Sequence, residues 1–455
     1  MRINFSHATY EEADLRRKNL MNSPGLTSQS NMRAIMLDTQ GPEIRTGSFG
    51  TDGKIELTTG SKLVITTDET YRFDQTSNIL WCSYPQLCTT VSPGSTILLD
   101  DGAIELQVDA TDNNEVSCTV MNSGQLGSRK GVNLPNSKVL LPAMSDKDAK
   151  DIRWGIKNDV DYIAVSFVRK AVDLTQIREY CRALMKEFSM EGPLPALISK
   201  IESTEAMENF DEILRETDGV MVARGDLGVE IPMETLAHAQ KEIVRKCNEA
   251  GKPVVVATQM LESMQKNPRP TRAECTDVAN AIYDGADCVM LSGESAKGKY
   301  PTESVQIMSK IIDNAELYGE NFDTSSLPVP NFEDPFESVA IGAVETSKSL
   351  DIECIVVIAE DAHIATKVSK FRPDVPVYTM VNNSKQGRML QMYRCIHPVL
   401  MNGKNMNDDD AVSDAIKELI VRNLVSSEDD VVVVSIEKET DVTSPGLSMR
   451  VVTIK

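Results

Sequence analysis

The sequence predicts an α/β protein built on a (β/α)8-type TIM barrel whose first strand is missing, with an inserted all-β lid domain and a C-terminal α/β domain. Three observations support this prediction. The middle of the 455-residue chain alternates short apolar runs with amphipathic helices. One long stretch nearer the N-terminus holds only short segments of alternating polarity. Beyond a polar linker, the alternation of strands and helices resumes.

Barrel strands are predicted where apolar runs lack a period-two pattern, as expected for parallel strands that are covered on both faces. A closed barrel of this type needs eight strands, whereas seven candidates are visible, so we expect the first barrel strand and helix to be absent. Helices are predicted at residues 235–250 and 301–317, where apolar side chains recur at helical spacing. The candidate strands are residues 1–5, 32–38, 161–168, 196–202, 219–226, 253–258 and 287–292.

The chain divides into predicted domains at changes of pattern. Residues 1–45 and 141–318 are expected to form the barrel. Residues 46–140 are predicted to be a β-rich lid inserted between two barrel strands, because Gly, Asn and Asp interrupt segments too short for helices. Residues 319–334 are rich in Asn, Asp, Ser and Pro, which predicts a linker. Residues 335–455 are expected to form an α/β domain with strands at 353–359, 375–381, 430–436 and 448–454 and helices at 336–349, 363–371, 385–393 and 410–424.

Composition and charge exclude several classes of protein. The chain carries 47 Lys and Arg against 68 Asp and Glu, a net charge of −21, which repels nucleic-acid phosphates and anionic lipids. It has no apolar run near the ~20 residues that span a bilayer, and its first residues lack the apolar region of a secretory signal. The 9 Cys include no CxxC pair and the 4 His are isolated, which argues against zinc and favours a reducing compartment. We therefore expect a cytoplasmic protein with neither nucleic acid nor membrane as a partner.

Polar residues follow the predicted strands at their carboxyl ends, the edge at which parallel βα proteins bind ligands. Such residues can simply belong to loops, but Lys200 and Glu202 are harder to explain in that way. A strand alternates its faces, so these two side chains lie on the same side at the barrel mouth. Glu202 and Asp226 provide two hard carboxylate ligands that suit Mg²⁺ or Mn²⁺. A pair of structural acids is the alternative, and Gly225 favours a function because it allows a ligand to approach the backbone closely.

Positive charge at the same rim would bind phosphate in an otherwise acidic protein. The candidate cations are Arg2, Arg45 and Lys200. With a metal ion they would form the charge clamp that phosphoryl transfer requires. The sequence contains neither a Walker A motif nor GxGxxG, which excludes P-loop enzymes and dinucleotide-binding proteins.

A series of motifs, spread in order along the chain, resembles one known family. The motifs are MRINFSH (1–7), LDTQGPEIRTG (37–47), LLDDG (98–102), SRKGVNLP (128–135), LISKIES (197–203), VARGDLGVEIP (222–232), ATQMLESM (257–264), NPRPTRAE (267–274) and DCVMLSGESAKGKYP (287–301). Together they resemble pyruvate kinase. The resemblance implies a barrel, a β-rich lid and a C-terminal α/β domain. It also implies transfer of a phosphoryl group from phosphoenolpyruvate to ADP, giving pyruvate and ATP in glycolysis, by a homotetramer.

The resemblance further implies roles for individual residues. Lys200 would stabilise the transferring phosphoryl group, and the Thr258 region would supply the proton to the enol, relayed by water or by Ser292 and Glu294. Glu202 and Asp226 would hold Mg²⁺ or Mn²⁺. Phosphoenolpyruvate would contact Arg2, Lys200, Gly225, Asp226 and Thr258, the nucleotide would contact Asn4, Ser6, His7, Arg45 and Lys130, and K⁺ would bind to Asn4, Ser6, Asp38 and Thr39.

Some positions depart from the family pattern. Gln40 replaces a usual Lys and is more typical of K⁺-independent members, whereas Glu43 matches the K⁺-requiring form. Residues 359–364 contain Glu360 and Asp361 where the family has a Ser/Thr-Gly loop for an effector sugar phosphate, so we expect no strong activation by fructose 1,6-bisphosphate.

Two alternative functions stay open. A catalytically impaired or regulatory pyruvate kinase relative would follow from the missing barrel strand. A Mg²⁺-dependent lyase would use a similar rim of Lys, Glu and Asp on pyruvate-like substrates. The predicted lid, together with Arg45 and Lys130, argues against the lyase.

Overall fold

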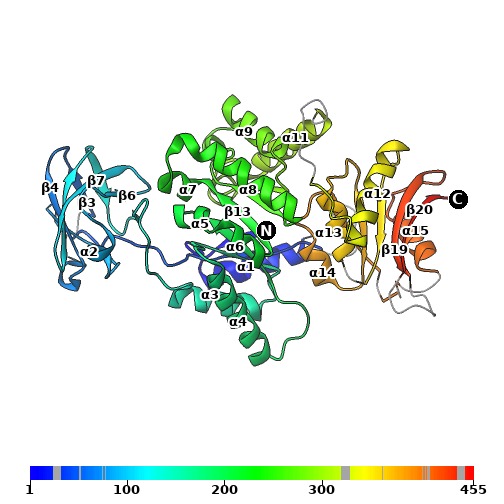
Figure 1. The fold of residues 1–455 in the computed structure, drawn as a ribbon, viewed down its shortest axis with the longest axis horizontal. Helices are drawn as coiled ribbons and strands as arrows, with labels where there is room; N and C mark the ends of the chain where they lie inside the picture. Colours follow the sequence, from blue (N-terminus) through cyan, green and yellow to red (C-terminus); the bar gives the residue numbers. More distant parts are fainter. Residues whose placement is uncertain are drawn as a thin grey trace.

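Three bodies lie in a row in the computed structural model (Figure 1). The β-rich body is at the left, the parallel sheet with its helices is at the centre, and the C-terminal α/β body is at the right. This arrangement confirms the predicted fold class. The structure describes residues 1–23, 32–50, 53–73, 75–76, 78–318, 328–360, 362–401, 403–404, 406, 410–437 and 446–455.

The central sheet contains, in the described part of the chain, seven parallel strands in the order β1–β2–β11–β12–β13–β14–β15. Neighbouring strands are level, since Asn4 pairs with Asp38 and Asp38 pairs with Ala164, so their carboxyl ends share one edge. No ladder joins β15 to β1 among the described residues, which leaves the curled sheet open. The strands are Arg2–Asn4 (β1), Met36–Asp38 (β2), Tyr162–Val165 (β11), Ala196–Ile201 (β12), Gly219–Ala223 (β13), Val254–Ala257 (β14) and Cys288–Met290 (β15).

Helices pack their apolar side chains against this sheet in one large core. Helix α8 (Leu236–Ala250) ends as predicted at Gly251, whose φ of 67° is the left-handed conformation that closes a helix. Helix α11 (Pro301–Tyr318) confirms the second predicted helix. The other barrel helices of eight or more residues are α1 (Tyr10–Asn22), α3 (Asp146–Lys157), α4 (Ala171–Glu187) and α9 (Arg272–Tyr283).

The predicted strands are wrong at several carboxyl ends, where they extend too far. Strand β13 ends at Ala223 and the chain continues into helix α7 (Arg224–Glu230), so Gly225 and Asp226 lie in a helical turn. The short helix forms because Leu227 turns into the buried core instead of continuing the strand. In the same way Thr258 lies beyond β14, and Ser292 lies beyond β15, directly before α10 (Gly293–Ala296).

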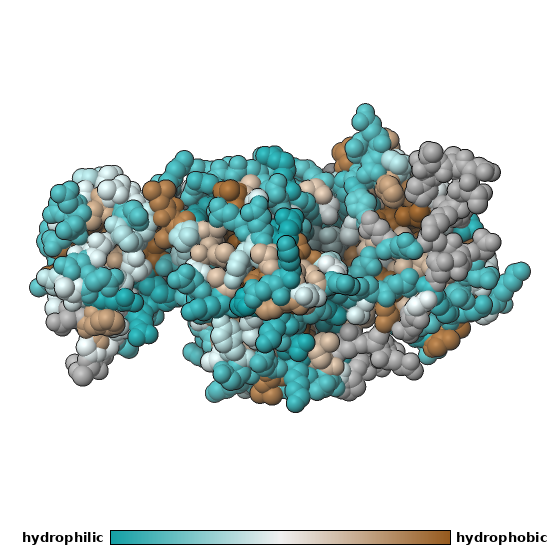
Figure 2. Space-filling model, turned by 90° about the horizontal axis from the view of Figure 1, so that it is seen from below, coloured by the Kyte–Doolittle hydropathy of each residue, from teal (hydrophilic) through white to brown (hydrophobic). Residues whose placement is uncertain are grey.

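The β-rich body has a core of its own. In β7, Ile104, Leu106 and Val108 are buried and alternate with exposed residues, as in a sheet with one solvated face. Two chain segments join this body to the barrel (Figure 1). In Figure 2 a notch separates the β-rich body from the barrel. One sheet has the order β10–β6–β7–β8–β4–β5 and a second pairs β3 with β9. The strands are Lys54–Leu57 (β3), Lys62–Thr66 (β4), Ile79–Trp81 (β5), Thr96–Leu99 (β6), Ile104–Thr111 (β7), Glu115–Val120 (β8), Gly124–Gly127 (β9) and Val132–Asn133 (β10).

The C-terminal body contains a five-stranded sheet in the order β18–β17–β16–β19–β20. Strand β18 (Ile396–Leu400) was not predicted because Pro398 interrupts its apolar run, and the proline is tolerated because β18 is an edge strand. Residues 319–327 of the predicted linker, and Asp361 of the predicted effector loop, lie outside the described residues. The remaining elements are α12 (Pro335–Ser349), β16 (Ile355–Ile358), α13 (His363–Lys370), β17 (Val377–Val381), α14 (Ser384–Met389), α15 (Ala411–Val421), β19 (Asp430–Glu437) and β20 (Gly446–Thr453).

Ion pairs join the C-terminal body to the amino edge of the barrel sheet. Arg388 Nε lies 2.8 Å from Asp161 Oδ1, and Arg372 Nη1 lies 2.6 Å from Asp287 Oδ1. Each of these acids directly precedes a barrel strand. The predicted functional residues lie at the opposite, carboxyl edge of the sheet, away from these ion pairs. The domain boundaries at residues 45, 140, 318 and 334 stay predictions from the sequence.

Candidate active site

Lys200 and Glu202 lie on the same side of the chain at the end of β12, as strand alternation predicts. Lys200 Nζ is 2.8 Å from Glu202 Oε1 and 3.3 Å from Asp38 Oδ1 at the end of β2. Both carboxylates are almost fully buried. Burial lowers the pKa of Lys200, but the charges of Asp38 and Glu202 outweigh it and raise the pKa above its usual value. The ammonium group therefore stays charged at neutral pH.

Asp38 connects this pair to the first strand. Arg2 Nε donates to Asp38 Oδ2 at 2.6 Å, so Arg2 and Lys200 share one buried carboxylate. Sequence reasoning missed Ser166, which follows β11. Its hydroxyl accepts from Lys200 Nζ at 2.7 Å and donates to the carbonyl of Thr39 at 2.7 Å. The sequence feature that could have indicated Ser166 is its position directly after an apolar strand.

A backbone N–H binds one carboxylate oxygen of Glu202, and the other oxygen faces Lys200. The N–H of Phe167, a residue with a left-handed φ of 56°, donates to Glu202 Oε2 at 2.6 Å. Glu202 Oε1 faces Lys200 as an ion pair, yet it is buried and accepts no hydrogen bond of good geometry from the described residues. A buried carboxylate oxygen in this state suits a cation as an additional partner.

Asp226 lies in the first turn of α7, close enough to Glu202 for their charges to interact. Burial raises the pKa of Asp226 to about 7, and the charge of Glu202 adds to the effect. Lys200 acts in the opposite direction, while Asp101 and Glu43 raise the pKa further. Asp101 belongs to the lid, so the lid contributes to the electrostatics of the rim. A divalent cation would relieve the repulsion among these acids.

Thr258 adopts a conformation that is rare for a β-branched residue, with φ of 68°, and Gln259 follows with φ of 54°. The Thr258 hydroxyl accepts from the N–H of Gly225 at 2.8 Å and donates to the carbonyl of Ala257 at 2.6 Å. The structure thus brings the two predicted residues Gly225 and Thr258 into direct contact.

Ser292 and Glu294 lie at the end of β15. Glu294 is fully buried, and its carboxylate accepts from the N–H of Leu261 at 3.0 Å and the N–H of Ser292 at 2.8 Å. The hydroxyl of Ser292 is buried, with no hydrogen-bond partner among the described residues. Glu294 therefore orients the loops around Thr258 and Ser292, while the Ser292 hydroxyl remains available to a bound molecule or water.

The residues predicted for K⁺ are bonded to protein groups. Asn4 Oδ1 accepts from the N–H of Ser6 at 2.9 Å. The Thr39 hydroxyl donates to the carbonyl of Ala164 at 3.3 Å, and Asp38 pairs with cations. Across the described ranges, no group of three or more His, Cys, Asp and Glu side chains gathers as a metal-ligand set.

The predicted nucleotide residues Arg45 and Lys130 lie where the lid joins the barrel, and both already pair with acids. Arg45 Nε lies 2.6 Å from Glu43 Oε2, and Lys130 Nζ lies 2.7 Å from Asp100 Oδ1. His7 is exposed beyond β1. Among the described residues, these three side chains make no direct contact with Lys200, Glu202 or Asp38. An incoming polyphosphate would have to compete with the acids for the two cations.

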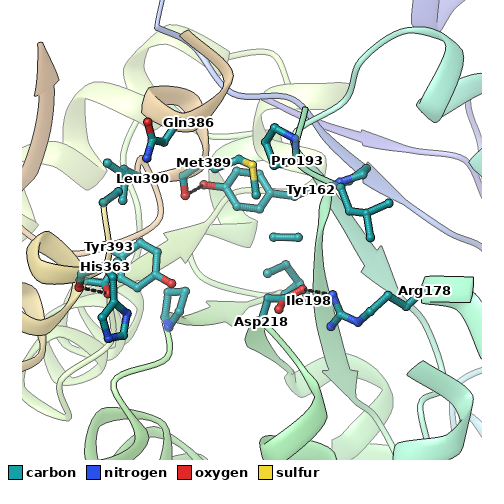
Figure 3. A pocket seen from close by; sticks show the side chains of 16 residues that line it. Tyr162, Arg178, Pro193, Ile198, Asp218, His363, Gln386, Met389, Leu390 and Tyr393 are labelled. Carbon is teal, nitrogen blue, oxygen red and sulfur yellow. Dashed lines mark hydrogen bonds and ion pairs between the residues drawn. The ribbon is translucent and has the colours of Figure 1, made fainter. Parts of the chain in front are cut away.

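A separate pocket of about 430 Å³ lies at the other edge of the sheet, between the barrel and helices α13 and α14 (Figure 3). Tyr162 and Asp218 line it from the barrel, and Met389 and Tyr393 line it from the C-terminal body. Arg178 Nη1 pairs with Asp218 Oδ2 at 3.0 Å across one wall. None of the predicted site residues lines this pocket.

Comparison with known proteins identifies the family. The family model "Pyruvate kinase, barrel domain" matches residues 1–305, and "Pyruvate kinase, alpha/beta domain" matches residues 337–444. The chain belongs to the pyruvate kinase family. Members of this family are phosphotransferases of glycolysis that use a divalent metal ion, and K⁺-requiring members are typical of the family.

Relatives match most of the chain. The pyruvate kinase of Agaricus bisporus is 42% identical over 88% of this chain and 74% of its own length. The cytosolic isozyme of Solanum tuberosum is 42% identical over 93% of this chain and 85% of its own. Pyruvate kinase PKLR of Homo sapiens is 42% identical over 88% of this chain and 70% of its own. Among the described helices, none has the length and apolar character needed to cross a bilayer.

Proposed function

We propose that this protein transfers the phosphoryl group of phosphoenolpyruvate to ADP, producing pyruvate and ATP, at the carboxyl edge of the barrel sheet. The buried cluster of Lys200, Glu202 and Asp38 carries the proposal. It places a permanently charged ammonium group beside two carboxylates, within the electrostatic reach of Asp226. Neither the relatives nor the described residues favour a catalytically impaired or regulatory protein. The lyase alternative lacks a role for a lid joined to this rim.

Glu202 and Asp226 are the residues that would hold Mg²⁺ or Mn²⁺. The buried Glu202 Oε1, which faces the Lys200 ammonium group, and the negative charge of Glu202 beside the buried Asp226 fit a divalent cation. When bound, the cation would neutralise charge on phosphoryl and carboxylate oxygens. Asn4, Ser6, Asp38 and Thr39 supply the oxygens for K⁺ in this proposal, with the requirement for K⁺ weakened by Gln40.

Lys200 and Arg2 provide the positive charge for the phosphoryl group. Arg2 binds the phosphate of phosphoenolpyruvate. Lys200 stabilises the negative charge that spreads over the oxygens of the phosphoryl group during transfer. Asp38 holds both cations in place, and Ser166 also holds Lys200. His7, Arg45 and Lys130 bind the nucleotide once the lid closes over it.

Protonation of the enol completes the reaction. After the phosphorus–oxygen bond breaks, C3 of the enolate takes one proton and the carbonyl of pyruvate forms. In this proposal the Thr258 hydroxyl, which accepts from the Gly225 N–H, donates the proton to C3. Ser292 and Glu294 relay a proton from water to this region. Gly225 and Thr258 also bind the carboxylate and enol region of the substrate in this proposal.

Oligomer and location complete the proposal. We place the protein in the cytoplasm, because the Solanum tuberosum relative is a cytosolic isozyme. The exposed edge strand β20, with exposed Met449 and Val451, offers a surface for a homotetramer. Light scattering on the purified protein tests the assembly.

A coupled assay tests the activity. Purified protein is incubated with phosphoenolpyruvate, ADP, Mg²⁺ and K⁺, and both ATP and pyruvate are measured. Equal amounts of the two products, lost on chelation of Mg²⁺, are expected. Pyruvate without ATP, or no turnover by a folded protein, contradicts the proposal.

A further inference from the structure

Arg224 makes contacts that the proposed reaction does not use. It is the first residue of α7, next to Gly225, and its side chain is mostly buried. Its guanidinium group donates to the carbonyl of Thr258 at 2.7 Å and, from Nε, to the carbonyl of Ala257 at 3.3 Å. Its Nη1 lies 2.7 Å from Asp277 Oδ1 on α9. Arg224 thus connects the end of β14 to a barrel helix.

These carbonyls belong to the most unusual turn of the site. Two consecutive left-handed residues, Thr258 and Gln259, redirect the chain directly after β14. A β-branched residue is strained in this conformation and keeps it only where its surroundings enforce it. A planar guanidinium group holds five donors in a rigid fork, so it can satisfy two adjacent carbonyls and a carboxylate at once.

Arg224 also acts on the bond that the Thr258 hydroxyl makes. That hydroxyl donates to the carbonyl of Ala257, the same oxygen that Arg224 Nε approaches. Arg224 Nε and the Thr258 hydroxyl therefore share this one oxygen as their acceptor. The N–H of Gly225 fixes the hydroxyl oxygen from the other side.

We infer that Arg224, anchored by Asp277, is a positioning residue that sets the Thr258 hydroxyl for proton transfer at C3 of enolpyruvate. The inference rests on the proposed function, in which Thr258 serves that step. Phosphoryl transfer itself depends on the charges of Lys200, Glu202 and Asp226, and no proton of the Thr258 hydroxyl moves in that step. Loss of Arg224 should therefore slow proton transfer more than it slows ATP formation.

Two reactions of the full-length protein separate these steps. ATP formation from phosphoenolpyruvate and ADP reports phosphoryl transfer, because released enolpyruvate also becomes pyruvate in water. Exchange of the C3 protons of pyruvate in D₂O, with Mg²⁺, K⁺ and ATP present, reports proton transfer. In the exchange, a C3–H bond breaks and a C3–D bond forms, with no net change in oxidation state.

The variants are Arg224→Met, Arg224→Lys, Asp277→Asn and Thr258→Ala. Arg224→Met should lower exchange about 10- to 100-fold, as expected for a misplaced reacting group, and ATP formation much less. Arg224→Lys should recover part of the exchange. Combining Arg224→Met with Thr258→Ala should lower exchange little beyond Thr258→Ala alone, because the two residues act in one unit.

A matched control is Arg178→Met at the opposite end of the barrel. Arg178 also donates to a carboxylate, Asp218 Oδ2, and to a backbone carbonyl, that of Glu216. Its loss should leave the ratio of exchange to ATP formation unchanged.

Equal losses of exchange and ATP formation in both Arg224 variants would overturn the inference, as would multiplicative losses in the double variant. If Arg224→Met is poorly folded, Arg224→Lys and Asp277→Asn, compared by the same ratio, decide the question. A parent protein that forms no ATP would instead contradict the proposed function.

Discussion

Replacement of Lys200 by Met tests the centre of the proposed site. The ammonium group lies 2.8 Å from Glu202 Oε1, 3.3 Å from Asp38 Oδ1 and 2.7 Å from Ser166 Oγ, so the protein holds it in place before substrate binds. A charge held in this way requires no reorganisation when charge develops on the transferring oxygens. The substitution removes that charge and keeps most of the side-chain volume.

The size of the effect follows from Coulomb's law. At about 4 Å from a phosphoryl oxygen and an effective dielectric constant of about 20, one charge contributes about 4 kcal/mol. If this interaction is made mainly in the transition state, kcat falls by about 10³-fold. KM for phosphoenolpyruvate should change much less, because the interaction strengthens as the phosphoryl group transfers.

The assay is steady-state turnover of Lys200→Met with both substrates varied, together with thermal melting. Lys252→Met is a matched control, because Lys252 Nζ donates to backbone carbonyls of Leu214, Arg215 and Thr217 at the other end of the barrel. It should lower the melting temperature while leaving kcat nearly unchanged. A folded Lys200→Met protein whose kcat stays within about tenfold of the parent, or whose only change is in KM, would refute the reasoning.

Three further predictions concern the metal, the C-terminal body and regulation. Asp226→Asn should raise the Mg²⁺ concentration needed for half-maximal turnover about tenfold or more, since one of two protein carboxylates is lost; an unchanged Mg²⁺ titration would contradict the metal assignment. Burial raises the pKa of Glu337, but hydrogen bonds from Lys367, Lys370 and the Asn331 N–H outweigh it and lower the pKa from 4.5 to about 2. Because the folded pKa is depressed, the stabilisation is complete above about pH 4.5 and is lost as the pH falls towards 2. Glu337→Gln should therefore lower the free energy of unfolding by about 3 kcal/mol at pH 7. Near pH 3, denaturant unfolding should show a much smaller difference between the variant and the parent. Equal differences at the two pH values would argue against the ion pair. Fructose 1,6-bisphosphate should leave half-saturation by phosphoenolpyruvate nearly unchanged because of the acidic loop that includes the exposed Glu360, and a large decrease in half-saturation would show that the loop does not exclude phosphate.

Contacts between distant strands were decided by the tertiary structure alone. Asp38, Ser166 and Lys200 belong to different strand ends, and only the register of β2, β11 and β12 brings them together. The raised pKa of Asp226 depends on burial in α7 and on neighbouring acids, including one from the lid. The predicted strand extended to Asp226, although the apolar run itself ends at Ala223, where β13 also ends.

The pattern of apolar residues, by contrast, predicts helices and strands directly from the sequence. Unbroken apolar runs determined the parallel strands of the barrel, because side chains on both faces of a covered sheet must be apolar. The alternation of a strand was enough to place Lys200 beside Glu202, since both positions belong to one segment. The left-handed turn at Thr258 and its clamp by Arg224 could not be inferred, because a strained backbone is held by contacts from α7 and α9 that the local sequence does not encode. The sequence by itself thus determined the elements and the residues at their ends, whereas packing between elements decided which of those residues meet.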